Sequence, residues 1–153
     1  MDVKYINPFL NATVEVLKTM AFMEARAGKP YLKTNHSAPG DVSAIIGITG
    51  HINGSLSLTF SSSCIIKIVD NMLGENFQEI NDDIKDAVGE LTNMISGVAR
   101  RRLSEIGFCF KIAIPTVVSG PGHQIKHMSK GPTIAIPFDT TAGSFTVEIN
   151  FSR

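Results

Sequence analysis

The chain has 153 residues, 43% of them hydrophobic and 18% charged, which is typical of a soluble globular protein, and we predict a single domain over residues 1–153. Its 14 basic and 14 acidic residues leave no formal net charge, which argues against binding to nucleic acid or an anionic membrane. The sequence has no signal peptide, lipidation motif or long apolar run, so we expect a cytoplasmic protein without a membrane span. Cys64 and Cys109 lie far apart, which fits a reducing compartment, and we expect both to be small buried hydrophobic residues.

The first half of the chain predicts one helix and three strands. An apolar residue recurs every three or four positions, which favours an amphipathic helix that ends before residues 28–30. The apolar positions are Val3, Ile6, Leu10, Val14, Leu17 and Ala21. Strand-like runs follow at 31–35, 42–49 and 55–60, and Asn53-Gly54 predicts a hairpin turn between the last two. We expect the three strands to form a meander.

The second half predicts a short helix, a long helix and three more strands. Hydroxyls at 61–63 can cap the short helix, and Gly74 is placed to end it. The long helix has Asn81 or Asp82 as its cap and ends at Gly107, with acidic residues near its start and arginines 100–102 near its end, as the helix dipole prefers. Strand-like runs follow at 108–118, 133–138 and 144–151, and we expect the Gly/Pro-rich loop 119–132 to be mobile.

This order of elements corresponds to an αβββ unit that occurs twice in succession along the chain. It predicts an α+β fold in which duplicated αβββ units form a six-stranded, largely antiparallel sheet. The two long helices pack on this sheet, since a helix with one apolar stripe must bury that stripe.

The long helix has two distinct faces when it is unrolled at about 100° per residue. The predicted core stripe consists of Ile84, Val88, Leu91, Ile95, Val98 and Ile106. The predicted outward face consists of Asp86, Gly89, Glu90, Asn93, Gly97 and Arg100.

Two glycines inside this helix need a physical reason, because each costs about 1 kcal/mol relative to alanine. Gly89 and Gly97 lie one turn on either side of Asn93, so they would clear the surface around one amide for a close approach by another molecule. Glu90 stands beside Asn93 on the same ridge. The alternative is that Glu90 and Asn93 are ordinary solvated residues and that the glycines permit packing within the same protein.

The segment from Asp86 to Gly97, with Glu90 and Asn93 in an ExxN spacing, resembles the [DS]xxxExxN motif of the CheC/CheX/FliY family of chemotaxis phosphatases. The family pattern continues to a proline; here 21 residues separate Asn93 from Pro115, one fewer than the pattern has. The CheC branch carries a second ExxN on its other long helix. Here the first helix has Pro8 three residues before Asn11, so the single site resembles the CheX branch.

The resemblance implies a protein phosphatase that hydrolyses the aspartyl phosphate of a CheY-type response regulator in chemotaxis signalling. In that function Asn93 orients the attacking water and Glu90 anchors the regulator's lysine. Mg²⁺ is expected on the regulator, with no cofactor on this chain. The resemblance also implies a homodimer joined through its sheets. Residues expected to contact the partner are Asp86, Gly89, Gly97 and Arg100, and the role of Asp86 can equally be confined to the helix dipole.

Two other functions stay open at this point. One is a non-catalytic module of the same superfamily that binds a response regulator or the flagellar switch. The other is a structural subunit that assembles through exposed sheet edges. His123 and His127 have a helical metal spacing but lie in a Gly/Pro-rich loop, so we expect solvated histidines and no metal site.

Overall fold

The computed structural model describes residues 3–152 and contains three helices and eight strands in that range. The elements are α1 (Val3–Ala21), β1 (Arg26–Ala27), β2 (Tyr31–Leu32), β3 (Val42–Gly50), β4 (Gly54–Phe60), α2 (Ser62–Leu73), α3 (Asp82–Glu105), β5 (Phe110–Ile112), β6 (Thr116–Ser119), β7 (Thr133–Thr140) and β8 (Gly143–Phe151). The expected α+β class is confirmed, with all eight strands in one antiparallel sheet.

The sheet has the order β1-β7-β8-β4-β3-β5, with β2 also paired to β7 and β6 also paired to β3. Hairpins β3–β4 and β7–β8 meet in the middle through β4 and β8. Each half of the chain places its first strands beside the hairpin of the other half, so the expected meander in the first half is wrong. The exchange agrees with two αβββ units that share one sheet.

The two outer strands of the expected sheet are each divided into two short pieces. The run 31–35 yields only the two residues of β2, preceded by β1, and Gly28-Lys29-Pro30 separates the two strands. The run 108–118 yields β5 and β6, with Pro115 between them. Proline lacks the N–H that a ladder needs, so the strand breaks there and resumes at Thr116. Eight strands therefore replace the six expected.

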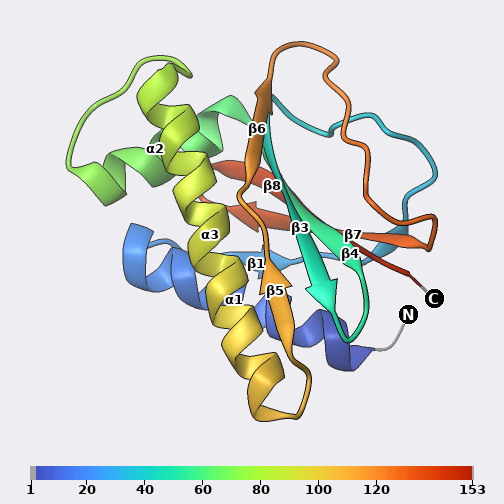
Figure 1. Ribbon diagram of the computed structural model, residues 1–153. Coiled ribbons are helices and arrows are strands. Elements are labelled where there is room, and N and C mark those ends of the chain that lie inside the picture. The colour runs from blue at the N-terminus through green and yellow to red at the C-terminus, as the bar shows by residue number, and fades with distance from the viewer. Residues whose placement is uncertain (1–2, 153) are drawn as a thin grey trace.

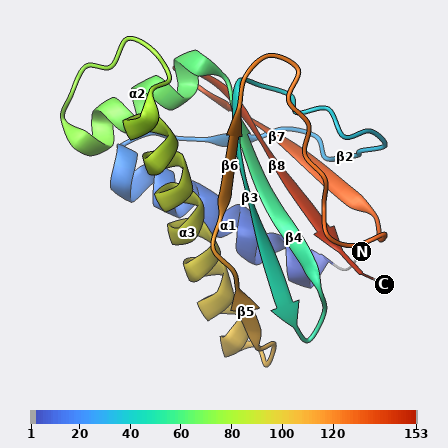
Figure 2. The same ribbon diagram turned by 45° about the horizontal axis from the view of Figure 1, so that its top comes forward.

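Helices α1 and α3 pack against each other on one face of the sheet and cross at an angle, and α2 packs against both of them (Figure 1). The segments 33–41 and 120–132 run over the opposite face, away from the helices (Figure 2). Alternate residues of the central strands, among them Leu58 and Val147, join the hydrophobic core beneath the helices. The sheet is therefore buried on both faces, by helices on one and by loops on the other.

The buried stripe of α1 differs from the expected one. Val3 is 64% exposed and Val14 is 37% exposed, although both belong to the apolar period. The residues that face the core are Phe9, Ala12, Thr13, Val16, Leu17 and Ala21. The buried stripe is thus rotated around the helix, because Ala12 and Thr13 are small enough to lie against neighbouring elements.

Candidate active site

Helix α3 is fixed at both ends by its own sequence. Asn81 caps the N-terminus, its side-chain Oδ1 accepting a hydrogen bond from the N–H of Ile84 at 3.0 Å. Gly107 has a φ of +94° just beyond the last turn, and the N–H of Phe108 donates to the carbonyl of Leu103 at 2.9 Å. Both expected termini are confirmed, so residues 82–105 form one continuous helix.

The inner stripe of α3 holds this helix against the core. Ile84, Val88, Leu91 and Ile95 are all completely buried. Val98 is half-buried, and Ile106 is 56% exposed, which contradicts its predicted place in the core. Ile106 is the C-cap residue with a φ of −105°, so it no longer follows the helical period. Four buried side chains over three turns give the outer face a rigid support.

The outer face carries Glu90 and Asn93, and both side chains are exposed as predicted. Among residues 3–152, neither side chain has a hydrogen bond or ion pair with the rest of the chain. Residues three apart on a helix are neighbours, with Cβ atoms about 5–6 Å apart. A carboxylate and a carboxamide therefore project together into solvent from a well-supported helix. Asp86, Gly97 and Arg100 are exposed on the same face.

The two glycines of α3 have different surroundings. Apart from its chain neighbours and the backbone of its own helix, no described atom would lie within 4 Å of a Cβ added to Gly97, whereas one at Gly89 would lie 3.5 Å from Cγ2 of Val117 and 3.9 Å from Cγ of Pro115. Gly89 is buried against the segment that precedes and begins β6. The surface is therefore cleared on the Gly97 side of Asn93 only, and the predicted exposure of Gly89 to a partner is wrong.

The first helix has no counterpart of the Glu90–Asn93 pair. Pro8 lies inside α1 and is half-buried, while Asn11 is exposed. The proline occupies the position from which a carboxylate would accompany Asn11, so the pair on α3 has no equivalent on α1.

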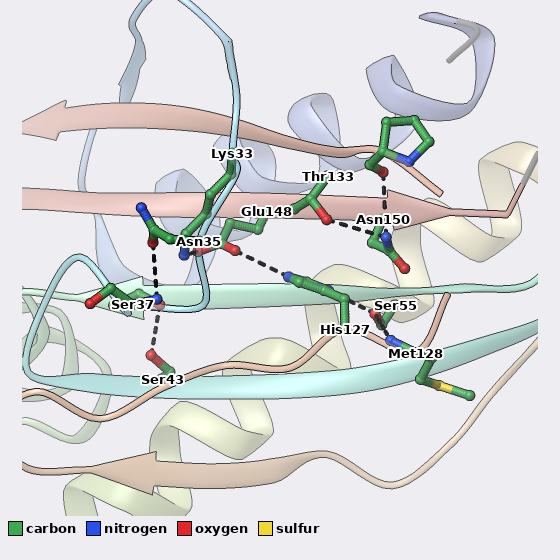
Figure 3. A network of polar contacts seen from close by, with 12 residues as sticks. Lys33, Asn35, Ser37, Ser43, Ser55, His127, Met128, Thr133, Glu148 and Asn150 are labelled. Atoms are coloured by element: carbon green, nitrogen blue, oxygen red, sulfur yellow. Dashed lines mark hydrogen bonds and ion pairs between the residues drawn. The ribbon is translucent and has the colours of Figure 1, made fainter. Parts of the chain in front are cut away.

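A second polar cluster lies on the sheet face opposite the helices (Figure 3). His127 contacts Ser55 Oγ at 2.7 Å through Nδ1 and Glu148 Oε1 at 3.1 Å through Nε2. Lys33 Nζ donates to the other oxygen of Glu148 at 2.7 Å. His123 Nε2 is 2.7 Å from Ser43 Oγ. The side chain of His127 is only 6% exposed, and His123 is half-buried. Both histidines are hydrogen-bonded, which corrects their expected solvation, and the loop that carries them is held to the sheet.

Burial by itself would raise the pKa of Glu148, but its hydrogen bonds and charge contacts with His127 and Lys33 outweigh that effect and lower the pKa below its ordinary value of 4.5. Ser55, His127 and Glu148 have the residue types of a nucleophilic triad. Ser55 is completely buried, however, and its Oγ accepts the N–H of Met128 at 3.2 Å. These contacts attach the loop to the sheet. Ser55 is not accessible to a substrate, so the cluster has a structural role.

This cluster was not predicted from the sequence, although the alternation of polar and apolar residues along β8 is a signal that could have located it. Thr146, Glu148 and Asn150 alternate along β8 with apolar residues and therefore share the face opposite the helices. Polar alternation usually marks a solvated face, but here all three residues are buried beneath the loops.

The described residues include no group of three or more histidine, cysteine, aspartate or glutamate side chains arranged to hold a metal ion. Cys64 is buried, and this burial raises the pKa of its thiol. Cys109 is exposed, which contradicts its expected place in the core. Within residues 3–152, none of the helices combines the length and hydrophobicity that crossing a bilayer requires.

The chemotaxis phosphatase CheX family matches residues 42–139 of the chain. The CheY-P phosphatase CheX of Thermotoga maritima is 33% identical over 138 residues, covering 90% of this chain and 88% of that protein.

Two crystal structures are similar over nearly the whole fold. The chemotaxis protein CheX from Desulfovibrio desulfuricans has a TM-score of 0.89 and 54% identity, covering 97% of this chain and 99% of that one. The CheX–CheY–BeF3–Mg²⁺ complex from Borrelia burgdorferi has a TM-score of 0.83 and 25% identity, covering 99% of this chain and 100% of that one.

Proposed function

The chain belongs to the chemotaxis phosphatase CheX family, and from this premise we propose that it is a response-regulator phosphatase whose active groups are Glu90 and Asn93. The substrate is the aspartyl phosphate of a CheY-type regulator. The observation that carries the proposal is the pair of exposed side chains on α3 that have no hydrogen-bond or ion-pair partner among residues 3–152. Side chains that have no partner in the described part of their own chain are available to contact groups of another protein.

The reaction needs few groups from this chain. A water oxygen forms a new bond to phosphorus while the bond to the aspartyl oxygen breaks, which yields inorganic phosphate and a free aspartate carboxylate. The transition state is loose, so catalysis consists mainly of placing the water in line and neutralising charge on the equatorial oxygens. We assign the Mg²⁺ to the regulator, in keeping with the CheX–CheY complex of the relative.

Asn93 has the hydrogen-bonding capacity to place that water. Its carboxamide oxygen accepts a hydrogen bond from the water while its NH₂ group donates one, which fixes the direction of the attacking lone pair. A carboxamide has no proton to exchange near neutral pH, so Asn93 contributes orientation and not general-base catalysis. Because Asn93 lies on a rigid helix, the orientation of its carboxamide is well defined.

Glu90 provides the anchor. Its carboxylate, one turn before Asn93, can pair with the lysine of the regulator's active site by a charge-assisted hydrogen bond. That pairing would set how deeply Asn93 enters the regulator. Asp86 and Arg100 are exposed on the same ridge and belong to the same contact surface in this proposal. The homodimer, the single domain and the cytoplasmic location stay predictions.

The direct test compares Asn93→Ala and Glu90→Ala in phosphate release from a regulator charged with acetyl phosphate. Asn93→Ala should lower the rate by about 10²–10³-fold, the loss seen when one preorganised polar group is removed, while complex formation persists. Glu90→Ala should weaken both binding and hydrolysis.

A matched control is Asn11→Ala, which removes an exposed carboxamide from α1, the helix without a neighbouring carboxylate. It should leave hydrolysis unchanged. Hydrolysis by Asn93→Ala at the wild-type rate would refute the assigned mechanism. Regulator binding without any hydrolysis by the wild-type chain would identify it instead as the non-catalytic binding module.

A further inference from the structure

A groove opens on α3 one turn beyond Asn93. It has a volume of about 530 Å³ and runs between the C-terminal half of α3 and the start of β5, from Gly97 past Arg100, Arg101 and Ser104 toward Cys109. Gly97 keeps the near end of the groove open, because no described atom outside the adjoining turns of α3 lies within 4 Å of the position that a Cβ would take. A molecule seated on Asn93 therefore meets this groove without an obstacle.

The three consecutive arginines at the end of α3 have different surroundings. Arg102 donates to the carboxylate of Glu15 on α1 at 2.6 Å, so its charge is used within the chain. Arg100 and Arg101 are exposed, and neither has a hydrogen bond or ion pair with any residue from 3 to 152. Two unpaired guanidinium groups consequently line one groove, with Glu105 as the only acidic residue among the described lining.

The outer ridge of α3 is therefore polarised along its length. Asp86 and Glu90 are negative, Asn93 is neutral and Arg100 is positive, and Arg101 adds a second positive charge in the groove beside Arg100. At about 1.5 Å per residue, Glu90 and Arg100 are separated by roughly 15 Å along the axis. A specific protein contact covers about 800 Å² on each partner. Arg100 lies about 10 Å along the axis from Asn93, so a contact of that size centred on Asn93 reaches the arginines.

We propose that the groove holds acidic side chains of the regulator that surround its phosphorylation site, and that Arg100 and Arg101 thereby fix the direction in which the regulator docks along α3. This inference rests on the proposed function. A protein that binds Mg²⁺ beside a phosphoryl group does so with a cluster of carboxylates, so its surface around that site is acidic apart from the lysine that meets Glu90. The carboxylates bound to Mg²⁺ stay beside Asn93, and the groove receives acidic side chains at the edge of that surface. Guanidinium groups match carboxylates in geometry as well as charge.

The reverse docking direction is penalised by the same charges. Turning the regulator end to end on α3 would bring its lysine toward Arg100 and its carboxylates toward Glu90. Like charges that face each other oppose association, and complementary charges accelerate it. The arginines are therefore positioning residues, whose contribution should appear in KM and in its dependence on salt and only weakly in kcat.

The experiment uses Arg100→Glu combined with Arg101→Glu in the full chain. We expect KM for the phosphorylated regulator to rise about tenfold at low salt, as for loss of electrostatic steering, while kcat changes far less. Raising the salt concentration should shrink the difference from wild type, because exposed charges are screened. A double variant with Gln at both positions should raise KM in the same way but by less. It replaces the charge-reversal variant if that variant does not fold.

The matched control is Lys18→Glu combined with Lys67→Glu, which changes the net charge by the same amount at exposed positions on α1 and α2. It should keep the wild-type KM. An equal rise in KM for the arginine and lysine double variants would indicate a general effect of net charge and would refute the proposed role of the groove. An unchanged KM for the arginine variants would also refute it. The Asn93→Ala result is independent, since it tests hydrolysis itself and not the docking direction.

Discussion

The surroundings of Gly97 distinguish the two interpretations of the glycines in α3, clearance for another molecule and packing within the same protein. It is exposed on the ridge that carries Asn93, and no other part of the described chain approaches the place of its missing side chain. Gly89, which the sequence places symmetrically about Asn93, is instead covered by Val117 and Pro115. Only Gly97 leaves room for another molecule.

Gly97→Ala should raise the free energy of unfolding by about 1 kcal/mol, because alanine has the higher helix propensity and its methyl group meets no atom. Urea denaturation followed by circular dichroism measures this change. The same variant should weaken association with the regulator, since the methyl group enters the groove. Gly89→Ala is the matched control, because its methyl group is buried under β6 and should leave the association unaffected. Equal association for wild type and Gly97→Ala would argue against close approach at this point.

Helix α3 is the element on which the site depends, and its termini are encoded locally. The cap at Asn81 and the left-handed Gly107 both follow from residue type, so the helix could be delimited from sequence to within a residue or two. The strands that flank it could not, because pairing partners are far apart in the chain. The proline at 115 divides one expected strand into β5 and β6, and the latter strand covers Gly89.

Asn81→Ala should cost about 1 kcal/mol of stability by leaving the N–H of Ile84 without its capping oxygen. Thermal unfolding of the variant should therefore begin at a lower temperature. Asn81→Asp restores a capping oxygen and should recover the loss. Because Glu90 lies more than two turns beyond the cap, kcat should stay near the wild-type value in both variants. A large loss of kcat in Asn81→Ala would mean that the motif is less firmly supported than the buried stripe indicates.

The whole molecule is one sheet covered by helices on one face and by loops on the other. The loops are attached to the sheet by the ion pairs of Glu148 with Lys33 and His127. The side chains of all three residues are almost completely buried. A buried charge is costly unless it is paired, so these three residues act as a unit. Asn150 strengthens the same attachment by accepting from the N–H of Ser129 at 3.0 Å and donating to the carbonyl of Gly131 at 3.0 Å.

Glu148→Gln should lower the free energy of unfolding at pH 7 by about 3 kcal/mol, because it leaves the ammonium of Lys33 buried without a carboxylate. The pKa of Glu148 is lower in the folded than in the unfolded chain. Its contribution is therefore present above about pH 4.5 and is lost as the pH falls through the folded value.

Urea titrations from pH 7 to pH 3 measure this effect, and the variant should lose less stability over that range than wild type. Glu15→Gln provides the control, because it breaks the half-exposed pair with Arg102 and should cost under about 1 kcal/mol. Similar losses for the two variants would contradict the assigned role of the buried cluster.

The local sequence was enough to predict the helices, the β3–β4 hairpin, the α+β class and the ridge that presents Glu90 and Asn93. Those features depend on periodicity, caps and turn residues, which act over a few positions of the chain. Tertiary contacts, in contrast, set the exchange of outer strands between the halves, the burial of Gly89, the attachment of the loop through Glu148 and the groove beside Arg100. Each of these brings together residues distant in sequence, and burial or exposure of a polar side chain depends on what another segment places over it.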